Sequence, residues 1–219
     1  MVTLSEENYL KAIYHLSNHG SISVSTNAIA SKMETKASSV TDMIKKLAEK
    51  ELVNYVKYQG VNLSNKGKYT AISVIRKHRL WEVFLVNKLN FSWDEVHDVA
   101  EQLEHIKSEK LIEHLEVFLE FPTHDPHGDP IPDKNGNLNP LDKVSLSTLE
   151  ENQESKLLSV KDSSDDFLKY LNKHEISIGN HIKVVSIEPY DKSLQIKINN
   201  NKMVISANVA ENLFVKAIK

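Results

Sequence analysis

Histidines and carboxylates recur in the middle of this 219-residue chain with the spacing of metal ligands. In the segment HDVAEQLEHI (97–106), four polar side chains share one arc of a helix at about 100° per residue, and apolar ones share the opposite arc. A solvated helix face usually carries Lys together with Glu, whereas both basic groups here are imidazoles. The i, i+3 and i+4 spacing lets Glu101, Glu104 and His105 converge on one cation, with His97 on the same arc.

Two more groups of nitrogen and oxygen ligands flank this segment. His78 and Glu82 are four residues apart in an apolar stretch, where a carboxylate or imidazole without a partner would be costly, and Asp125 and His127 follow in the proline-rich stretch 122–140. The chain has no cysteine, so any metal must use nitrogen and oxygen ligands. This donor set suits Mn²⁺ or Fe²⁺, while Zn²⁺ would also bind by raw affinity. A single such residue is usually structural or solvent-exposed, but three separate groups together favour a metal site.

Composition limits the class of protein. An apolar content of 40% is normal for a globular chain, and the length allows one large domain or two to three small ones. A net charge of -3 argues against a wholly basic nucleic-acid coat but allows a local basic patch. The N-terminal residues show no basic segment followed by an apolar one, and no window approaches the roughly 18 apolar residues of a membrane span. We therefore expect a soluble, cytoplasmic protein without membrane association.

The N-terminal 70 residues carry the pattern of a winged helix-turn-helix. A helix is predicted over residues 5–17 with Ser5 as its N-cap, followed by two helices, 26–33 and 37–52, on either side of the short turn ETK. Two short β-rich runs then surround a turn at Gln59-Gly60, and Ser64 is placed to cap the next helix.

The second of the paired helices is the predicted DNA-recognition helix. In such motifs its N-terminal part meets base edges, while hydroxyls and lysines hold phosphates. Lysines outnumber acids between Lys32 and Lys68, as docking on DNA requires. A protein-interaction or dimerisation module is the alternative, but the wing and the local charge both favour DNA. The base-edge candidates are Lys36, Ser38 and Asp42, and the phosphate candidates are Ser39, Thr41, Lys45, Lys46, Lys57 and Tyr58.

The rest of the chain predicts a helical middle and a β-rich end. Apolar periodicity predicts helices over 68–89, 93–106 and 108–120, and the stretch 122–140 is an ordered loop or a linker. The C-terminal part predicts one helix and three strands, typical of a small closed barrel. The fold class is therefore mainly α. The expected domains are 1–70 (winged helix-turn-helix), 71–140 (helical metal-binding and dimerisation domain), 141–164 (linker) and 165–219 (small barrel).

Several segments occur in one order that resembles a known family. They are LSEENYLKAIYHL, SSVTDMIKKL, VKYQGVNLSNKG, KHRLWEVFL, HDVAEQLEHI and FPTHDPHGDPIP. Together they resemble the diphtheria toxin repressor family of metal-dependent transcriptional repressors, over the whole chain. The resemblance implies a winged helix, a helical metal-binding and dimerisation domain, and a C-terminal SH3-like (FeoA-like) β-barrel.

The same resemblance implies two metal sites. Iron-responsive members place Cys where this chain has Glu101, so the site looks closer to the manganese-responsive branch. That branch has Asp where this chain has Asn8, and Lys11 replaces a carboxylate of some two-domain members, which argues against a binuclear site of their kind. The implied primary ligands are Asn8, Glu101, Glu104 and His105, and the implied second-site ligands are His78, Glu82, His97, Asp125, His127 and Asp162.

The function implied is metal-activated repression rather than catalysis. Mn²⁺ or Fe²⁺, with Mn²⁺ favoured and Zn²⁺ or Co²⁺ able to substitute in vitro, would lock a homodimer that binds palindromic double-stranded operators of metal-homeostasis genes. Because the ligands must be deprotonated, DNA affinity should fall below neutral pH. One alternative is a metallohydrolase, although the chain has no Gly-rich phosphate loop and no HExxH motif. The other is a winged-helix regulator that senses an organic ligand.

Overall fold

The computed structural model describes residues 2–56 and 59–218, so the predicted phosphate contacts Lys57 and Tyr58 lie outside the described residues. The chain divides into two compact units, and the division falls within one long helix, α4 (Asn65–Leu89). The first unit comprises Met1–His78, Glu101–Ile112 and Pro132–Asn137, and the second comprises Arg79–Ala100, Glu113–Ile131 and Leu138–Lys219.

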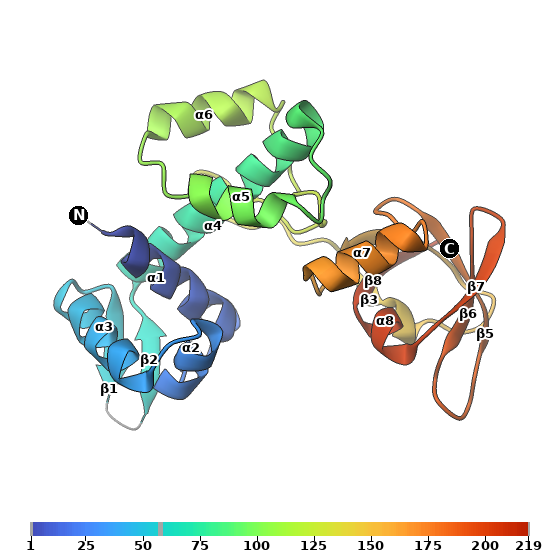
Figure 1. The fold of residues 1–219 in the computed structure, drawn as a ribbon, viewed down its shortest axis with the longest axis horizontal. Helices are drawn as coiled ribbons and strands as arrows, with labels where there is room; N and C mark the ends of the chain where they lie inside the picture. The colour runs from blue at the N-terminus through green and yellow to red at the C-terminus, as the bar shows by residue number, and fades with distance from the viewer. Residues whose placement is uncertain (1, 57–58, 219) are drawn as a thin grey trace. The chain divides into compact units, whose positions relative to one another are not determined.

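Three helices, a hairpin and the first half of α4 form most of the first unit (Figure 1). The first helix starts at a capping box, because the Thr3 hydroxyl accepts from the Glu6 amide at 3.3 Å while the Glu6 carboxylate accepts from the Thr3 amide at 2.9 Å. Thr3 is therefore the N-cap, and the prediction of Ser5 is wrong. The elements are α1 (Leu4–Leu16), α2 (Thr26–Lys32), α3 (Ala37–Glu49), β1 (Val53–Val56), β2 (Gly60–Leu63) and the first half of α4.

The predicted helix-turn-helix and hairpin are confirmed. The apolar positions of α3, Val40, Ile44 and Leu47, recur at helical spacing and are fully buried. Ile29 of α2 is buried in the same core. The strands β1 and β2 pair antiparallel, from Val53 opposite Leu63 to Val56 opposite Gly60, and Ser64 accepts from the Gly67 amide as a cap of α4.

The second unit contains an antiparallel sheet with the strand order β3-β8-β4-β5-β6-β7, together with α7 and α8 (Figure 1). Residues of both helices belong to the buried core of this sheet. In the described part of the chain the end strands β3 and β7 do not pair with each other, so the closed barrel is not confirmed and the sheet is open. The elements are β3 (Val144–Ser145), the 3₁₀ turn η1 (Leu146–Thr148), β4 (Glu154–Val160), α7 (Asp165–Lys173), β5 (His181–Ile187), β6 (Leu194–Ile198), β7 (Asn201–Ile205), α8 (Ala207–Glu211) and β8 (Leu213–Ile218).

The segment 141–164, assigned to a linker on sequence grounds, instead contributes the strands β3 and β4 to this sheet, with η1 between them. Strand β4 is hard to detect because two of its inward positions, Ser155 and Ser159, are polar although fully buried. The Ser155 hydroxyl donates to the Ile182 carbonyl at 3.2 Å, which satisfies it inside the sheet. A search for alternating apolar residues therefore fails to detect this strand.

The proline-rich stretch forms an ordered loop that packs against β4. The Val160 amide donates to the His127 carbonyl at 3.0 Å. Gly128 has φ +84, and a Cβ at that position would lie 2.0 Å from the Leu158 carbonyl oxygen. Only glycine allows both this backbone conformation and this close approach.

A comparison of two glycines tests this contact. Gly179 has a similar φ of +92, but its Cβ would meet only the Lys156 side chain at 4.0 Å. Gly128→Ala should lower the free energy of unfolding by at least about 2 kcal/mol more than Gly179→Ala, because both add backbone strain but only Gly128→Ala adds a backbone clash. Equilibrium urea unfolding measures the difference, and equal losses in the two variants would show that the loop does not depend on this contact.

Candidate metal centres

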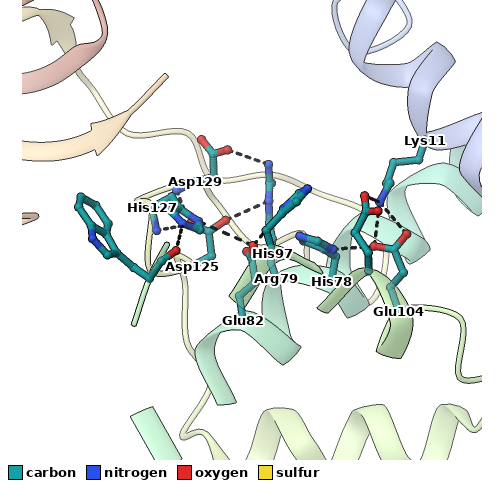
Figure 2. Close-up of polar contacts among 11 residues, drawn as sticks. Lys11, His78, Arg79, Glu82, His97, Glu104, Asp125, His127 and Asp129 are labelled. Atoms are coloured by element: carbon teal, nitrogen blue, oxygen red, sulfur yellow. Dashed lines mark hydrogen bonds and ion pairs between the residues drawn. The ribbon is translucent and has the colours of Figure 1, made fainter. Parts of the chain in front are cut away.

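A fully buried carboxylate, Glu104, lies in the turn directly after α5 (Val96–Leu103). The helix is shorter than the predicted 93–106, so Glu104 and His105 leave the helical face on which Glu101 remains. Lys11 Nζ approaches the two Glu104 oxygens at 2.6 and 2.9 Å, and His78 Nδ1 lies 2.6 Å from Oε2 (Figure 2). A buried carboxylate needs such cationic or hydrogen-bonding partners to offset its lost hydration.

The imidazole of His105 is held in one orientation. Its Nδ1 lies 2.6 Å from the Glu7 carboxylate of α1, while its Nε2 lies 3.6 Å from Glu104 Oε1. A carboxylate that accepts from Nδ1–H leaves the lone pair on Nε2, which faces Glu104. Metal-binding histidines are typically oriented by a carboxylate in this way.

Asn8 supplies the second sign of a ligand site in this unit. Its Oδ1 atom is buried and accepts no hydrogen bond within the described residues. A buried carbonyl oxygen without a donor requires an explanation, and coordination of a cation is one. The donor set of Asn8, two carboxylates and an imidazole fits a divalent ion that prefers nitrogen and oxygen ligands. However, in the described structure the ligand atoms of Glu101, Glu104 and His105 do not all lie within 4.8 Å of one another.

A second cluster surrounds Glu82, on the half of α4 that belongs to the other unit. Its Oε1 lies 3.8 Å from His127 Nδ1 and 3.7 Å from His97 Nδ1. The Trp93 carbonyl lies 2.8 Å from His127 Nε2, so donation from that nitrogen leaves Nδ1 to face Glu82 (Figure 2). Glu82, Asp125 and His127 offer ligand atoms within 4.8 Å of one another. His78 precedes Glu82 by one turn of α4, so the two side chains emerge from the same face of the helix.

The other two predicted ligands of this site have different surroundings. Asp125 Oδ1 accepts from the amides of His127 and Asp129, both at 2.9 Å, and Oδ2 lies 3.4 Å from Arg79 Nε. Asp125 therefore organises its own loop. Asp162 accepts from the Ser164 amide at 2.9 Å, and no contact with Glu82, Asp125 or His127 is found for it in the described residues.

Charge coupling shifts two groups of the Glu82 cluster. Burial raises the pKa of Asp125, and the nearby Glu82 carboxylate adds to this effect, so the pKa reaches about 7 although Arg79 opposes the shift. Burial alone would lower the pKa of His127, but the Glu82 and Asp125 carboxylates outweigh it and raise the pKa to about 9. In the metal-free protein His127 is therefore protonated near neutral pH.

The DNA-contact candidates on α3 are mostly exposed. The hydroxyl of Thr41 already donates a hydrogen bond within α3, to the Ala37 carbonyl at 2.9 Å. Asp42 and Lys45 form an exposed ion pair at 3.6 Å. The exposed candidates are Lys36, Ser38, Ser39, Asp42, Lys45 and Lys46.

Comparisons with known proteins agree with this architecture. Residues 1–61 match the N-terminal DNA-binding domain of the iron-dependent repressors, and residues 64–133 match their metal-binding and dimerisation domain. A solved manganese-dependent transcriptional repressor in complex with manganese has a TM-score of 0.85 and 30% identity over 97% of this chain and 100% of its own. The chain belongs to the iron-dependent repressor family. The resemblance inferred from the sequence is thereby confirmed.

Two relatives of this iron-dependent repressor family are similar over the first part of the chain. The iron-dependent repressor IdeR of Mycobacterium leprae is 35% identical over 126 residues, 58% of this chain and 54% of the relative. The diphtheria toxin repressor of Corynebacterium jeikeium is 32% identical over 127 residues, 58% of this chain and 52% of the relative. The chain thus spans about half the length of these relatives. Residues 144–217 match a FeoA domain, which includes the strands β3 and β4.

On α1, two residues that contact the candidate ligands are missed by the sequence analysis. Glu7 has no predicted role, and Lys11 enters only as a departure from the family pattern. The two lie four residues apart on α1, next to Asn8, so their common helix face was a usable signal. Among the described residues, no helix combines the length and apolar character needed to cross a membrane.

The raised pKa values predict how the metal-free protein responds to pH. The raised pKa of His127, about 9, stabilises the folded protein at pH values below the ordinary histidine pKa of 6.5, and this stabilisation is lost as the pH rises from 6.5 to 9. The raised pKa of Asp125 has the same sign, so its stabilisation is lost as the pH rises from about 4 to 7. With a chelator present, the melting temperature should therefore fall between pH 6.5 and 9, and His127→Gln should flatten this fall by at least about 2 °C. Thermal unfolding followed by circular dichroism at several pH values measures the melting temperatures of both proteins. Parallel curves for the two proteins would contradict the role assigned to His127.

Proposed function

We propose that this protein is a metal-activated transcriptional repressor, which binds double-stranded operator DNA as a homodimer when Mn²⁺ or Fe²⁺ is bound. Membership of the iron-dependent repressor family supports this proposal, as do the separate matches to DNA-binding and metal-binding models. The observation that carries it is the buried Glu104 carboxylate, which the oriented imidazole of His105 faces. On α1, next to the Glu7 that orients this imidazole, Asn8 has a buried oxygen that accepts no hydrogen bond in the described residues.

The proposed primary site uses two charged and two neutral ligands. Glu101 and Glu104 would provide carboxylate oxygens, and His105 would provide Nε2, the nitrogen not facing Glu7. Asn8 would provide only its carbonyl oxygen. The bound ion supplies a double positive charge that joins α1 to the segment after α5. We favour Mn²⁺ over Fe²⁺ because Glu101 is a hard ligand, and Zn²⁺ or Co²⁺ can substitute in vitro.

The proposed second site is built around Glu82. His97 and His127 face this carboxylate, and His78 shares its helix face. Asp125 as a ligand would have to share its oxygens with two backbone amides and Arg79, so we assign it first to the loop. Asp162 stays a predicted ligand.

The proposed link between metal and DNA is the orientation of α3. Helix α1 carries Asn8 and packs with α2 and α3 around one core. A cation that ties α1 to Glu104 and His105 would select one orientation of the recognition helix from a broader set. A two-fold dimer must present two such helices to major-groove faces about 34 Å apart, which is why a palindromic operator is expected.

An exposed apolar surface on the second unit supports dimer formation. Val117 and Phe118 at the end of α6 (Glu109–Phe118) and Phe121 just beyond it are 59, 57 and 62% exposed. Several large apolar side chains exposed within a few residues of one another are typical of an association surface. We propose that a second copy of the chain covers it, as the dimerisation model matched by residues 64–133 suggests.

Of the two alternative functions, one is set aside and one is testable. The family consists of repressors, not enzymes, so a metallohydrolase is not favoured. A winged-helix sensor of an organic ligand would be nearly indifferent to the loss of a carboxylate at Glu104. The cytoplasmic location stays a prediction.

A charge-neutral variant of Glu104 tests the proposed function. An operator selected from random DNA by the wild-type protein with Mn²⁺ serves as the probe, and fluorescence anisotropy measures binding with Mn²⁺ and with EDTA. Glu104→Gln should weaken Mn²⁺-dependent binding by about 100-fold or more, because the ion loses a buried anionic ligand.

Glu113→Gln is the matched control, because Glu113 is an exposed carboxylate on α6 and no contact with a candidate ligand is found for it in the described residues. It should bind the operator like the wild type. Equal wild-type binding with Mn²⁺ and with EDTA, or a Glu104→Gln variant with unchanged Mn²⁺ response, would refute the proposal.

A second variant tests the role of Glu7 in orienting His105. Glu7→Gln should weaken Mn²⁺ binding by about 10- to 100-fold in a direct calorimetric titration, because the imidazole loses the acceptor that fixes its tautomer. Glu6→Gln, one residue earlier on α1, is the control and should change the affinity by less than about threefold. If both variants lose affinity equally, the effect belongs to α1 in general and not to the contact with His105.

A further inference from the structure

Helix α1 brings a lysine to the carboxylates that the proposed primary site would use. Lys11 Nζ lies 2.6 and 2.9 Å from the two oxygens of Glu104 and 2.9 Å from Glu101 Oε1 (Figure 2). All three contacts lie within the first unit. The ammonium therefore sits among three carboxylate oxygens, as a bound cation would.

The burial of this contact separates it from an ordinary surface ion pair. The side chain of Lys11 is 15% exposed and that of Glu104 is 0% exposed. An exposed pair contributes little, but two charges removed from water depend strongly on each other. Helix α1 offers a comparison, because Lys50 binds Glu6 at 2.7 Å with its own side chain 40% exposed.

A divalent ion and the ammonium compete for the same oxygens. A metal bound by Glu101 and Glu104 needs the lone pairs that now accept from Lys11, and an ammonium has no lone pair with which to coordinate a metal. The two cations would also repel each other across a few ångströms. The ion must therefore displace Lys11 from at least one carboxylate.

We infer that Lys11 is a tethered counter-cation of the primary site, which a divalent ion must displace, so that this lysine raises the metal concentration at which the protein switches. The inference rests on the proposed function, because it concerns the same ligands.

The counter-cation also has a role before metal arrives. Without it, Glu101 and the buried Glu104 would repel each other, and Glu104 would depend on its contacts with the imidazoles of His78 and His105. Lys11 thus holds α1 against the segment after α5 in the metal-free protein. It contacts neither Asn8 Oδ1, which accepts no hydrogen bond in the described structure, nor the His105 ring, whose Nδ1 is bound by Glu7. Two predicted ligands are therefore left for the ion.

The test is a direct metal titration of the metal-free full-length chain, without DNA. Lys11→Met should bind Mn²⁺ at least about tenfold more tightly than the wild type, because an opposite charge within a few ångströms alters cation binding at a carboxylate by about 10- to 1,000-fold. Lys50→Met removes the same charge from another Lys–Glu pair of the same unit, and its dissociation constant for Mn²⁺ should stay within about twofold of the wild-type value. Isothermal titration calorimetry measures the dissociation constants.

Stability gives a second measurement. Metal-free Lys11→Met should unfold at lower urea than the wild type, and saturating Mn²⁺ should remove or reverse this difference. If Lys11→Met does not fold without metal, Lys11→Gln replaces it, since its amide still donates a hydrogen bond to Glu104 but carries no charge.

The outcomes separate this inference from the proposed function. Suppose that the wild type binds Mn²⁺ and the operator as proposed, but that Lys11→Met and Lys11→Gln bind Mn²⁺ no more tightly than the wild type. Only the inference about Lys11 is then overturned, and the proposed function stands. If no protein of the series binds Mn²⁺, both the inference and the proposed function are overturned. Tighter binding in both Lys11 variants, with Lys50→Met unchanged, establishes the competition.

Discussion

The buried charge of Glu104 is the constraint on which the first unit depends. A carboxylate with no exposed surface must be balanced, and the balance comes from Lys11 on α1 and His78 on α4. These partners are separated from it by 93 and 26 residues, so one charge holds together three distant parts of the chain. Since α1 packs in the same core as α3, whatever cation neutralises Glu104 also influences the recognition helix. Replacing Lys11 by another cation would therefore change the contact that holds α1 against Glu104.

The two candidate metal centres orient their imidazoles by the same device. A fixed acceptor takes one ring nitrogen, the Glu7 carboxylate for His105 and the Trp93 carbonyl for His127, and the other nitrogen faces a buried carboxylate. A ring held in this way has already lost the rotational freedom that a ligand gives up on binding a metal. The two acceptors differ in charge, because Glu7 is anionic and the Trp93 carbonyl is neutral. Glu7 therefore places a negative charge beside the His105 site, which favours a dication there.

The sequence predicted those features that depend on local periodicity. The buried positions of α3 follow a helical spacing, and β1 and β2 surround the predicted turn at Gln59-Gly60. Strand β4 was missed because Ser155 and Ser159 occupy inward positions, and the closed barrel was not confirmed because the alternation of a strand does not say which neighbours pair at the edges of a sheet. The contacts of Lys11 and Glu7 join residues that are 90 or more positions apart in the sequence, and no local pattern indicates that such distant residues are in contact. The ligand assignments themselves stay predictions.

A lysine at position 11 reflects a compromise between stability without metal and affinity for it. A neutral side chain there would leave Glu101 and Glu104 repelling each other in the metal-free protein, and a carboxylate would add a third negative charge to the same place. Both changes would favour a divalent ion by destabilising the metal-free state. The ammonium does the opposite, since it satisfies the carboxylates with a single charge that stays attached to the chain. A tethered cation is always present at a fixed effective concentration, whereas the divalent ion varies with supply. The occupancy of the site therefore follows the free metal concentration only above the level at which the ion outcompetes Lys11, and this is the behaviour that a sensor of metal excess requires.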